Sequence, residues 1–216
     1  MTAAPPLLEV RGLSASYRTP GGVIHAVRDV SFELRAGETL ALVGESAAGK
    51  STIGLALLGL LPPNAGVEAG DARFAGESLL DAPPERLRQI RGAEIAMIFQ
   101  DAQSALTPTI AVGDQVAEVY AAHLRLPKKE ARQRALARLR EVLPDAERVA
   151  KAYPFQLSGG MAQRVMIAMA TALQPRVIIA DEPTASLDPA VRLETLAALE
   201  RLRDEQGVAV LLITHD

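Results

Sequence analysis

The chain has 216 residues, 49% of them hydrophobic, with 16 glycines and 14 prolines, which excludes a wholly disordered chain and suits one or two domains with a buried core. Its 23 basic and 26 acidic residues give a formal charge of −3, so the basic excess typical of nucleic-acid binding is absent and we expect no nucleic-acid partner. Without cysteine, this sequence holds no disulfide, zinc–thiolate site or thiol nucleophile.

The N-terminal residues Met1–Pro6 lack the basic region and apolar core of a signal peptide. The longest apolar runs, Ile53–Leu61 and Val165–Leu173, are far shorter than the roughly 20 residues that a membrane-spanning helix needs. We therefore expect a chain that is soluble by itself and that reaches a membrane only through a partner.

The first hundred residues predict strands that are separated by glycine turns and interrupted by one helix. That helix is predicted over Lys50–Leu61, where Pro62 and Pro63 stop it. The predicted strands are Val23–Leu34, Thr39–Val43, Val67–Phe74 and Glu94–Phe99.

From about residue 106 to 172 the apolar spacing becomes helical, and after Pro175 strand and helix alternate. Apolar strands buried on both faces, alternating with helices, predict an α/β core with a mainly parallel sheet, into which a helical subdomain is inserted. The predicted helices are Asp114–Leu126, Lys128–Leu143, Ser158–Leu173 and a helix from Asp188-Pro189 to Gly207, and the predicted strands are Arg176–Asp181 and Val208–Thr214.

The segment Gly44–Ser51, here called the P-loop, fits G-x-x-x-x-G-K-[ST] and lies between a predicted strand and a predicted helix. Lys50 would oppose the helix dipole in the first turn unless an anion lay beside it. The expected anion is a nucleotide phosphate held by loop N–H groups, with the Ser51 hydroxyl on Mg²⁺. The alternative is a plain strand–turn–helix.

Asp181 and Glu182 end the apolar strand Arg176–Asp181. Because neighbouring strand residues point to opposite sides, the two acids should have different roles. Asp181 suits contact with Mg²⁺, and Glu182 suits polarising an attacking water. Acids that merely end a strand at a turn are the alternative.

The segment Leu157–Met161, here called the signature segment, opens a helix that Ser158 can cap, and Gly159 and Gly160 allow close backbone approach. An ordinary capped helix start would explain this segment alone. The chain nevertheless has two helix ends ready for an anion and only one acid pair, so the second end could serve a nucleotide held by another copy.

With these segments in place, the sequence resembles the ATP-binding subunit of an ATP-binding-cassette (ABC) transporter over nearly its whole length. The P-loop matches Walker A, Val177–Asp181 matches Walker B and Leu157–Met161 matches the signature. Further matches are the D-loop at Ala185–Asp188, the Q-loop glutamine Gln100, the switch histidine His215 and the adenine-stacking aromatic Tyr17.

The resemblance implies roles for individual residues. Catalysis would involve Glu182, His215 and Gln100, and Mg²⁺ would be held near Ser51, Gln100 and Asp181. ATP would be bound by Tyr17, Gly44, Glu45, Ser46, Ala47, Ala48, Gly49, Lys50, Ser51 and Thr52. In trans, the signature residues Ser158, Gly159, Gly160 and Met161 would complete the site of a partner copy.

Two further segments resemble the oligopeptide, dipeptide and nickel importers: Ile98–Asp101 with Ser104–Pro108, and Tyr153–Met161. The implied function is to bind and hydrolyse ATP and so power import of peptides or similar small solutes. The implied partners are a second ABC ATPase subunit (identical or paralogous), integral membrane permease subunits and, indirectly, an extracytoplasmic solute-binding protein. The implied place is the cytoplasmic face of the inner membrane.

The implied fold is a P-loop NTPase core of the ABC type with N-terminal antiparallel strands. Residues 1–216 would form one ATP-binding domain, with 1–100 and 174–216 as catalytic core and about 101–173 as helical subdomain. The family continues beyond the switch histidine, so we expect a C-terminal truncation after Asp216.

Three residues depart from the family pattern. Ala47 and Ala48 replace the usual Gly and Ser of this group, and Ala162 replaces a basic residue. If position 47 requires positive φ, alanine costs on the order of 1 kcal/mol there. Two other functions are therefore kept as alternatives: a soluble ABC-type ATPase without a transport role, as in DNA repair or translation, and a non-catalytic fragment that only binds a partner.

Overall fold

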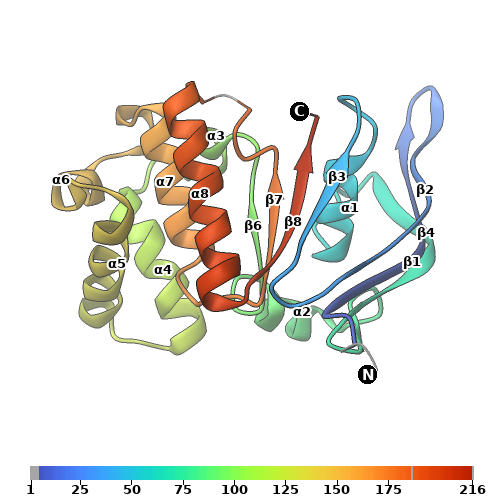
Figure 1. Cartoon of the computed structure of the whole chain (residues 1–216), viewed down its shortest axis with the longest axis horizontal. Coiled ribbons are helices and arrows are strands. Elements are labelled where there is room, and N and C mark those ends of the chain that lie inside the picture. The colour runs from blue at the N-terminus through green and yellow to red at the C-terminus, as the bar shows by residue number, and fades with distance from the viewer. Residues whose placement is uncertain (1–4, 186, 216) are drawn as a thin grey trace.

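The computed structural model describes residues 5–185 and 187–215. An antiparallel sheet, a parallel sheet and a group of helices lie side by side along the long axis (Figure 1). This arrangement confirms the predicted α/β fold with a parallel core sheet and N-terminal antiparallel strands.

The antiparallel sheet has the strand order β2-β1-β4-β5. Its central strand β1, to which sequence reasoning assigned no boundaries, pairs with both β2 and β4, and register shifts near Gly12 interrupt its apolar alternation. The strands are β1 (Leu8–Thr19), β2 (Gly22–Leu34), β4 (Ala65–Phe74) and β5 (Glu77–Ser78).

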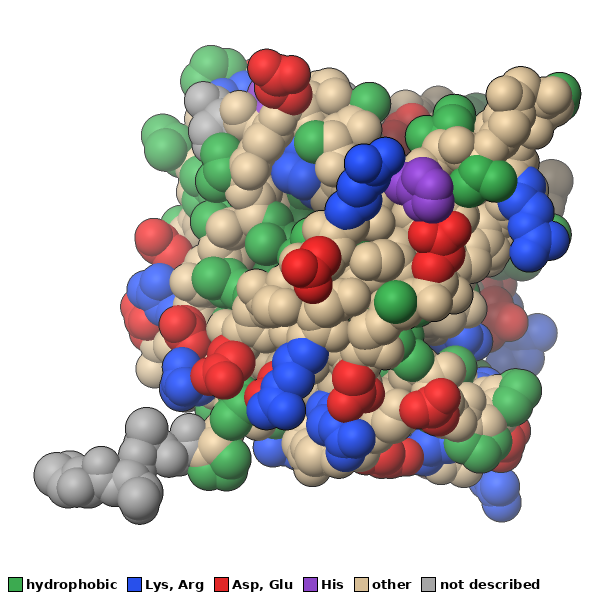
Figure 2. Space-filling view, turned by 90° about the vertical axis from the view of Figure 1, so that its right-hand side faces the viewer, with side chains coloured by type: hydrophobic (Ala, Val, Ile, Leu, Met, Phe, Trp, Pro, Cys, Tyr) green, Lys and Arg blue, Asp and Glu red, His purple; other side chains and the backbone are tan. Residues whose placement is uncertain are grey.

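The outer face of this sheet carries interspersed charges of both signs (Figure 2). One polar cluster there joins three strands: the Ser16 hydroxyl donates to Glu68 Oε1 at 2.7 Å, and His25 Nδ1 lies 2.9 Å from Glu68 Oε2. The Ser16 and His25 hydrogen bonds lower the pKa of Glu68. The cluster therefore holds β1, β2 and β4 together at the solvent side.

The parallel sheet has the order β3-β8-β7-β6, and every adjacent pair of its strands is parallel. The carboxyl ends of its strands consequently meet at one edge, the usual place for ligands in such sheets. The strands are β3 (Thr39–Val43), β6 (Ile95–Ile98), β7 (Val177–Asp181) and β8 (Ala209–Thr214).

The helices α4 to α8 form the group that is farthest from the antiparallel sheet in Figure 1, whereas α1 packs between the antiparallel and the parallel sheet. Among the described residues, no helix combines the length and the apolar character needed to cross a bilayer. The helices are α1 (Lys50–Leu57), α2 (Pro84–Ile90), α3 (Ala102–Ala105), α4 (Val112–Leu124), α5 (Lys128–Val142), α6 (Ala146–Lys151), α7 (Gly159–Ala170) and α8 (Pro189–Gln206), with a 3₁₀ turn at Pro154–Gln156.

Helix α1 ends at Leu57, four residues before the predicted end at Leu61. Gly59 adopts φ +59°, its N–H donates to the carbonyl of Ala56, and the Leu60 N–H donates to that of Leu55. These bonds form a left-handed glycine cap, which ends the helix before the two prolines are reached.

Two clusters of buried side chains pack against opposite faces of the parallel sheet. Along β7, Val177 and Ile179 belong to the cluster with α1 and the antiparallel sheet, whereas Ile178 and Ala180 belong to the cluster with the helices. This alternation is the two-residue period of a strand that is buried on both faces. The sheet is thus a rigid support for the loops at its carboxyl edge. The division into a catalytic core and a helical subdomain stays a prediction.

Candidate functional site

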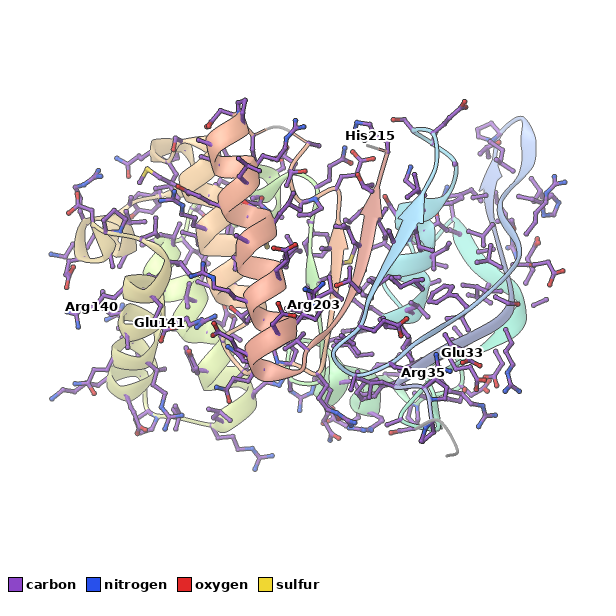
Figure 3. The ribbon with its side chains drawn as sticks, viewed as in Figure 1. Glu33, Arg35, Arg140, Glu141, Arg203 and His215 are labelled. Atoms are coloured by element: carbon purple, nitrogen blue, oxygen red, sulfur yellow. The ribbon has the colours of Figure 1, made fainter. Side chains whose placement is uncertain are left out.

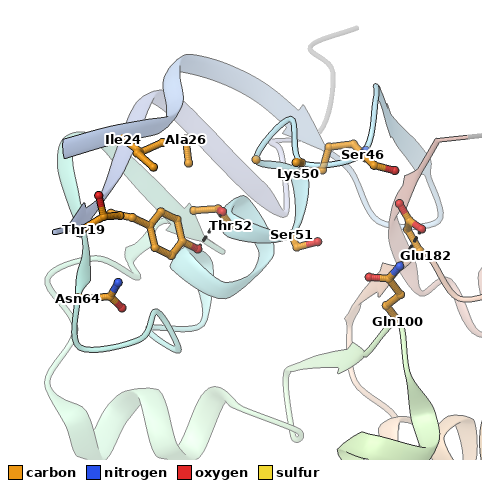
Figure 4. Close-up of a pocket in the computed structure, with 13 residues that line it drawn as sticks. Thr19, Ile24, Ala26, Ser46, Lys50, Ser51, Thr52, Asn64, Gln100 and Glu182 are labelled. Atoms are coloured by element: carbon orange, nitrogen blue, oxygen red, sulfur yellow. Dashed lines mark hydrogen bonds between the residues drawn. The ribbon is translucent and has the colours of Figure 1, made fainter. Parts of the chain in front are cut away.

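A cavity of about 460 Å³ opens at the carboxyl edge of the parallel sheet (Figure 4). It brings together predicted residues from segments that are far apart in the sequence. Those that line it are Tyr17, Ser46, Ala47, Gly49, Lys50, Ser51, Thr52, Gln100 and Glu182. Gly44, Glu45 and Ala48 belong to the same loop without lining the cavity, and Asp181 and His215 contact its lining residues.

The P-loop is held by its own lysine. Lys50 Nζ donates to the carbonyl oxygens of Gly44 at 2.7 Å and Glu45 at 2.8 Å, so the ammonium lies across the loop. Gly49, which precedes α1, has φ +88°, and a Cβ added there would lie 2.0 Å from the carbonyl oxygen of Ala26. Only glycine fits at that position, because strand β2 passes directly beside the loop.

Ala47 has φ +65°, the left-handed conformation that the family's usual glycine adopts without strain. The condition set from the sequence is therefore met, and the alanine costs on the order of 1 kcal/mol. The P-loop thus contains one strained residue besides its glycines.

Asp181 lies at the end of β7, beside the first turn of α1. The Ser51 hydroxyl donates to Asp181 Oδ1 at 3.0 Å. Burial, together with the nearby charge of Glu182, raises the pKa of Asp181, although the Ser51 hydrogen bond opposes the shift. A hydroxyl and a carboxylate oxygen are ligands that Mg²⁺ accepts alongside substrate phosphates, so this pair fits a magnesium site.

The side chain of Glu182 contacts a different set of residues from the side chain of Asp181. Gln100 Nε2, just after β6, donates to Glu182 Oε2 at 3.1 Å, and His215 Nδ1, just after β8, lies 3.1 Å from the same oxygen. The Glu182 side chain is only 10% exposed, and its backbone has φ +42°, a strained conformation for this residue. Figure 3 shows His215 at the carboxyl edge of the sheet. Side chains at the ends of three neighbouring strands, β6, β7 and β8, thus meet at the Oε2 oxygen of Glu182.

The far end of the cavity lies on the antiparallel sheet, where the Tyr17 hydroxyl and the Thr52 hydroxyl are 3.1 Å apart. Sequence reasoning missed four lining residues there. Ile24 is the cross-strand partner of Tyr17, so a predicted β1–β2 pairing could have found it. The four are Thr19, Ile24, Ala26 and Asn64.

The signature segment does not line this cavity; Leu157 is buried, Gly160 and Met161 are partly exposed, and Ser158 and Gly159 lie at the surface. The Ser158 hydroxyl accepts from the N–H of Met161 at 3.3 Å, which confirms the predicted cap of α7. Ser158 and Gly159 are exposed, and a Cβ added at Gly159 would meet nothing within 4 Å. The structure therefore does not bring Ser158–Met161 to the cavity of the same chain.

The predicted D-loop is described only in part. Ser186 lies outside the described residues, as does Asp216. Asp188 accepts from the N–H groups of Ala190 and Val191 and caps α8 as predicted, and Gly207 ends that helix with φ +68°.

Comparison with known proteins agrees with this geometry. The family model described as "ABC transporter" matches residues 27–185, and the chain belongs to that family. It is 49% identical to a putative peptide import ATP-binding protein of Brucella abortus (strain 2308) over 98% of this chain and 64% of that protein. It is 44% identical to the oligopeptide transport ATP-binding protein OppD of Escherichia coli (strain K12), over 99% of this chain and 63% of that protein.

The fold is similar to solved ATP-binding cassettes. A dimeric structure of the cassette MJ0796 in a post-hydrolysis state with ADP and Pi has a TM-score of 0.84 and 30% identity, over 97% of this chain and 88% of that chain. The cassette cbiO1 of Clostridium perfringens has a TM-score of 0.75 and 29% identity, over 99% and 80%. The chain spans a little under two thirds of the length of its curated relatives.

Proposed function

We propose that this chain binds Mg²⁺ and ATP in the cavity and hydrolyses the ATP to power peptide import through a membrane transporter. The observation that carries the proposal is the convergence on one cavity of the Lys50 ammonium, the Ser51–Asp181 pair and the buried Glu182 carboxylate. A cation, a metal-ligand pair and a base are the three parts that phosphoryl transfer to water requires.

In the proposed complex, Lys50 exchanges its two loop carbonyls for phosphate oxygens, and the loop N–H groups of Gly44–Ser51 donate to the same phosphates. Tyr17 offers its ring face to the base at the other end of the cavity. Ser51 and Asp181, with Gln100 beside them, would hold Mg²⁺. Bound there, Mg²⁺ would neutralise charge on the phosphate oxygens.

Glu182 is the proposed base. Its Oε2 is held by Gln100 and His215, and the described residues give its Oε1 no partner, so Oε1 is free to accept a proton from water. The water oxygen would bond to the γ-phosphorus as the bond to the ADP oxygen breaks. Gln100 and His215 orient the carboxylate, which lowers the cost of reaching the reactive geometry.

The exposed signature segment is proposed to act in a dimer. Ser158, Gly159, Gly160 and Met161 would present the positive N-terminus of α7 to the γ-phosphate of a nucleotide bound by a partner ATPase, identical or paralogous. The dimeric form of the similar cassette MJ0796 supports this assignment.

The transport role rests on the relatives, which are named for peptide import and oligopeptide transport. We therefore propose membrane permease subunits as direct partners, an extracytoplasmic solute-binding protein as an indirect one, and a peripheral position at the cytoplasmic face of the membrane. These names favour import over an ABC ATPase without a transport role. Stable co-purification with integral membrane subunits is the expected result, and a protein that never enters such a complex would contradict it.

The test of the catalytic assignment is Glu182→Gln. Turnover should fall at least about a hundredfold because the amide cannot take the proton. Binding should survive, seen as a rise of the melting midpoint with Mg·ATP. Glu200→Gln on the exposed side of α8 is the control, with turnover like the parent. Parent-like turnover in Glu182→Gln would refute Glu182 as the base, and a parent without any Mg·ATP shift would favour the non-catalytic alternative.

A further inference from the structure

Asn64 lines the cavity at the end opposite the phosphate-binding groups. It lies in the connection between α1 and β4, at the same end as Thr19, whereas Ser46 and Glu182 lie at the other end (Figure 4). Asn64 is also hydrogen-bonded to Arg18, the neighbour of Tyr17 in the chain. A nucleotide with its phosphates at Lys50 and its base against Tyr17 therefore places the edge of that base near Asn64.

The orientation of the Asn64 amide is set by its neighbour. Arg18 N–H donates to the Asn64 carbonyl at 2.7 Å, and Asn64 Nδ2 donates to the Arg18 carbonyl at 3.2 Å. Because a carbonyl can only accept, the nitrogen of the amide must face Arg18. An asparagine amide has two donor hydrogens and one acceptor oxygen, so one N–H and Oδ1 remain for a ligand.

The side-chain hydroxyl groups at this end of the cavity already have hydrogen-bond partners within the protein. The Tyr17 hydroxyl is paired with Thr52, and the Thr19 hydroxyl donates to the carbonyl of Gly22 at 2.8 Å. Ile24 and Ala26 are apolar. Among the described residues that line this end, Asn64 is thus the side chain with both a donor and an acceptor to offer.

We propose that Asn64 determines base specificity by recognising the edge of adenine that carries the 6-amino group and the neighbouring ring nitrogen. The Oδ1 oxygen accepts from the amino group, and the remaining N–H donates to the ring nitrogen. An asparagine side chain makes this two-point contact with adenine when it reads DNA. The proposal rests on the proposed function, since it assumes that the cavity binds ATP.

The same contact discriminates against 6-oxo purines. Guanine and hypoxanthine present an oxygen where adenine has its amino group, so Oδ1 would face a second acceptor. A pair of acceptors without a proton between them leaves both unsatisfied once the base has displaced water. We expect ATP to bind about tenfold more tightly than a 6-oxo nucleotide, the loss of one such pair.

The experiment measures the dissociation constants of three magnesium nucleotides: ATP, ITP and 7-deaza-ATP. ITP replaces the amino group with oxygen, and 7-deaza-ATP replaces the ring nitrogen with carbon. The parent should bind ITP about tenfold and 7-deaza-ATP about threefold more weakly than ATP. In Asn64→Ala the three constants should fall within about twofold of one another.

Thr19→Val is the matched control, because it changes a hydroxyl at the same end that Gly22 already engages, and it should keep the parent's order of affinities. The comparison within the parent needs no variant, so it stands even if Asn64→Ala lowers the stability of its loop. If the parent binds the three nucleotides equally, or if Asn64→Ala keeps the tenfold spread, Asn64 does not read the base. If the parent binds none of them, the proposed function itself fails.

Discussion

The sequence predicts an anion-binding N-terminus at two helices, α1 and α7, and the structure surrounds them differently. The N-terminus of α1 is enclosed by other parts of the chain at the cavity, whereas that of α7 is exposed to solvent. At α1, β2 passes so close that Gly49 cannot carry a side chain, and Lys50 closes the loop. At α7, the Ser158 hydroxyl caps the helix, and the space around Gly159 is open.

The difference shows that a helix dipole alone does not make a complete site. The N–H groups at α1 lie beside the Lys50 ammonium of the same helix. The Asp181 carboxylate, paired with Ser51, and the Glu182 carboxylate reach this site from the end of β7. Within the described residues of this chain, the N–H groups at α7 have no comparable cation and pair of carboxylates beside them. We therefore propose that the α7 terminus is half of a site, and that a second molecule supplies the other half.

The largest expected effect comes from adding one methyl group at Gly49, the residue that precedes α1. Gly49→Ala puts a Cβ against the Ala26 carbonyl oxygen and holds alanine at φ +88°, which should cost about 3 kcal/mol or more. We expect the melting midpoint to fall by about 10 °C and the shift with Mg·ATP to be lost.

Gly159→Ala is the matched substitution at the open terminus. It should leave the midpoint within about 2 °C of the parent, because nothing lies within 4 Å of the added atom. Its effect should fall on turnover, through the partner copy. Equal loss of stability in the two variants would show that the two helix starts are equally enclosed and would remove the contrast.

A smaller effect is expected from Ala47→Gly, which relieves the left-handed alanine in the P-loop. The gain should be about 0.6 kcal/mol, or a midpoint about 2 °C higher, because the greater freedom of glycine in the unfolded chain offsets part of the relieved strain. Ala48→Gly is the control, since Ala48 is not among the residues with positive φ, and it should be neutral or destabilising. A gain in Ala48→Gly equal to that in Ala47→Gly would contradict strain as the cause.

The smallest effect is a pH-dependent gain in Asp181→Asn. Burial raises the pKa of Asp181, so its charged form weakens the fold, and this cost grows as pH rises from the unfolded-state pKa through the raised one. Asparagine lacks the cost and can still accept from Ser51. We expect the variant to melt up to about 2 °C above the parent near pH 8 and at the same midpoint near pH 4.

The same variant should lose Mg²⁺-dependent turnover, a trade of function for stability. A midpoint difference that is constant with pH would mean that the titration of Asp181 is not its source. The α7 terminus, which holds no acidic residue in its first turn, offers no comparable gain.

Local signals allowed much of the fold to be predicted. The strand Thr39–Val43 and the helix that starts at Asp188-Pro189 and stops at Gly207 were found with their boundaries, because each carries its own start and stop residues. For α1 the signals competed: Gly59 stops the helix before the prolines, and Arg91 then binds the carbonyls of Leu58 and Gly59. Arg91 is distant in sequence, so no local pattern contains this contact.

In the candidate site, too, the features that depend on local sequence were predictable and those that depend on long-range packing were not. The P-loop and the acid pair at Asp181 and Glu182 were identifiable because their chemistry depends on spacing along the chain. The lining by Ala26 and Asn64 depends on how the antiparallel sheet packs against the P-loop, and no local spacing encodes that packing. Residue roles at the site remain predictions that the proposed variants test.

The position of β8 in the parallel sheet has a consequence for biosynthesis. This strand is the last one in the described chain, yet it lies between β3 and β7 and pairs with both. While the chain emerges from the ribosome, those two strands present unpaired edges until β8 has been made, and an unpaired edge is a template for aggregation. The carboxyl edge of the sheet is therefore completed only after β8 has been made.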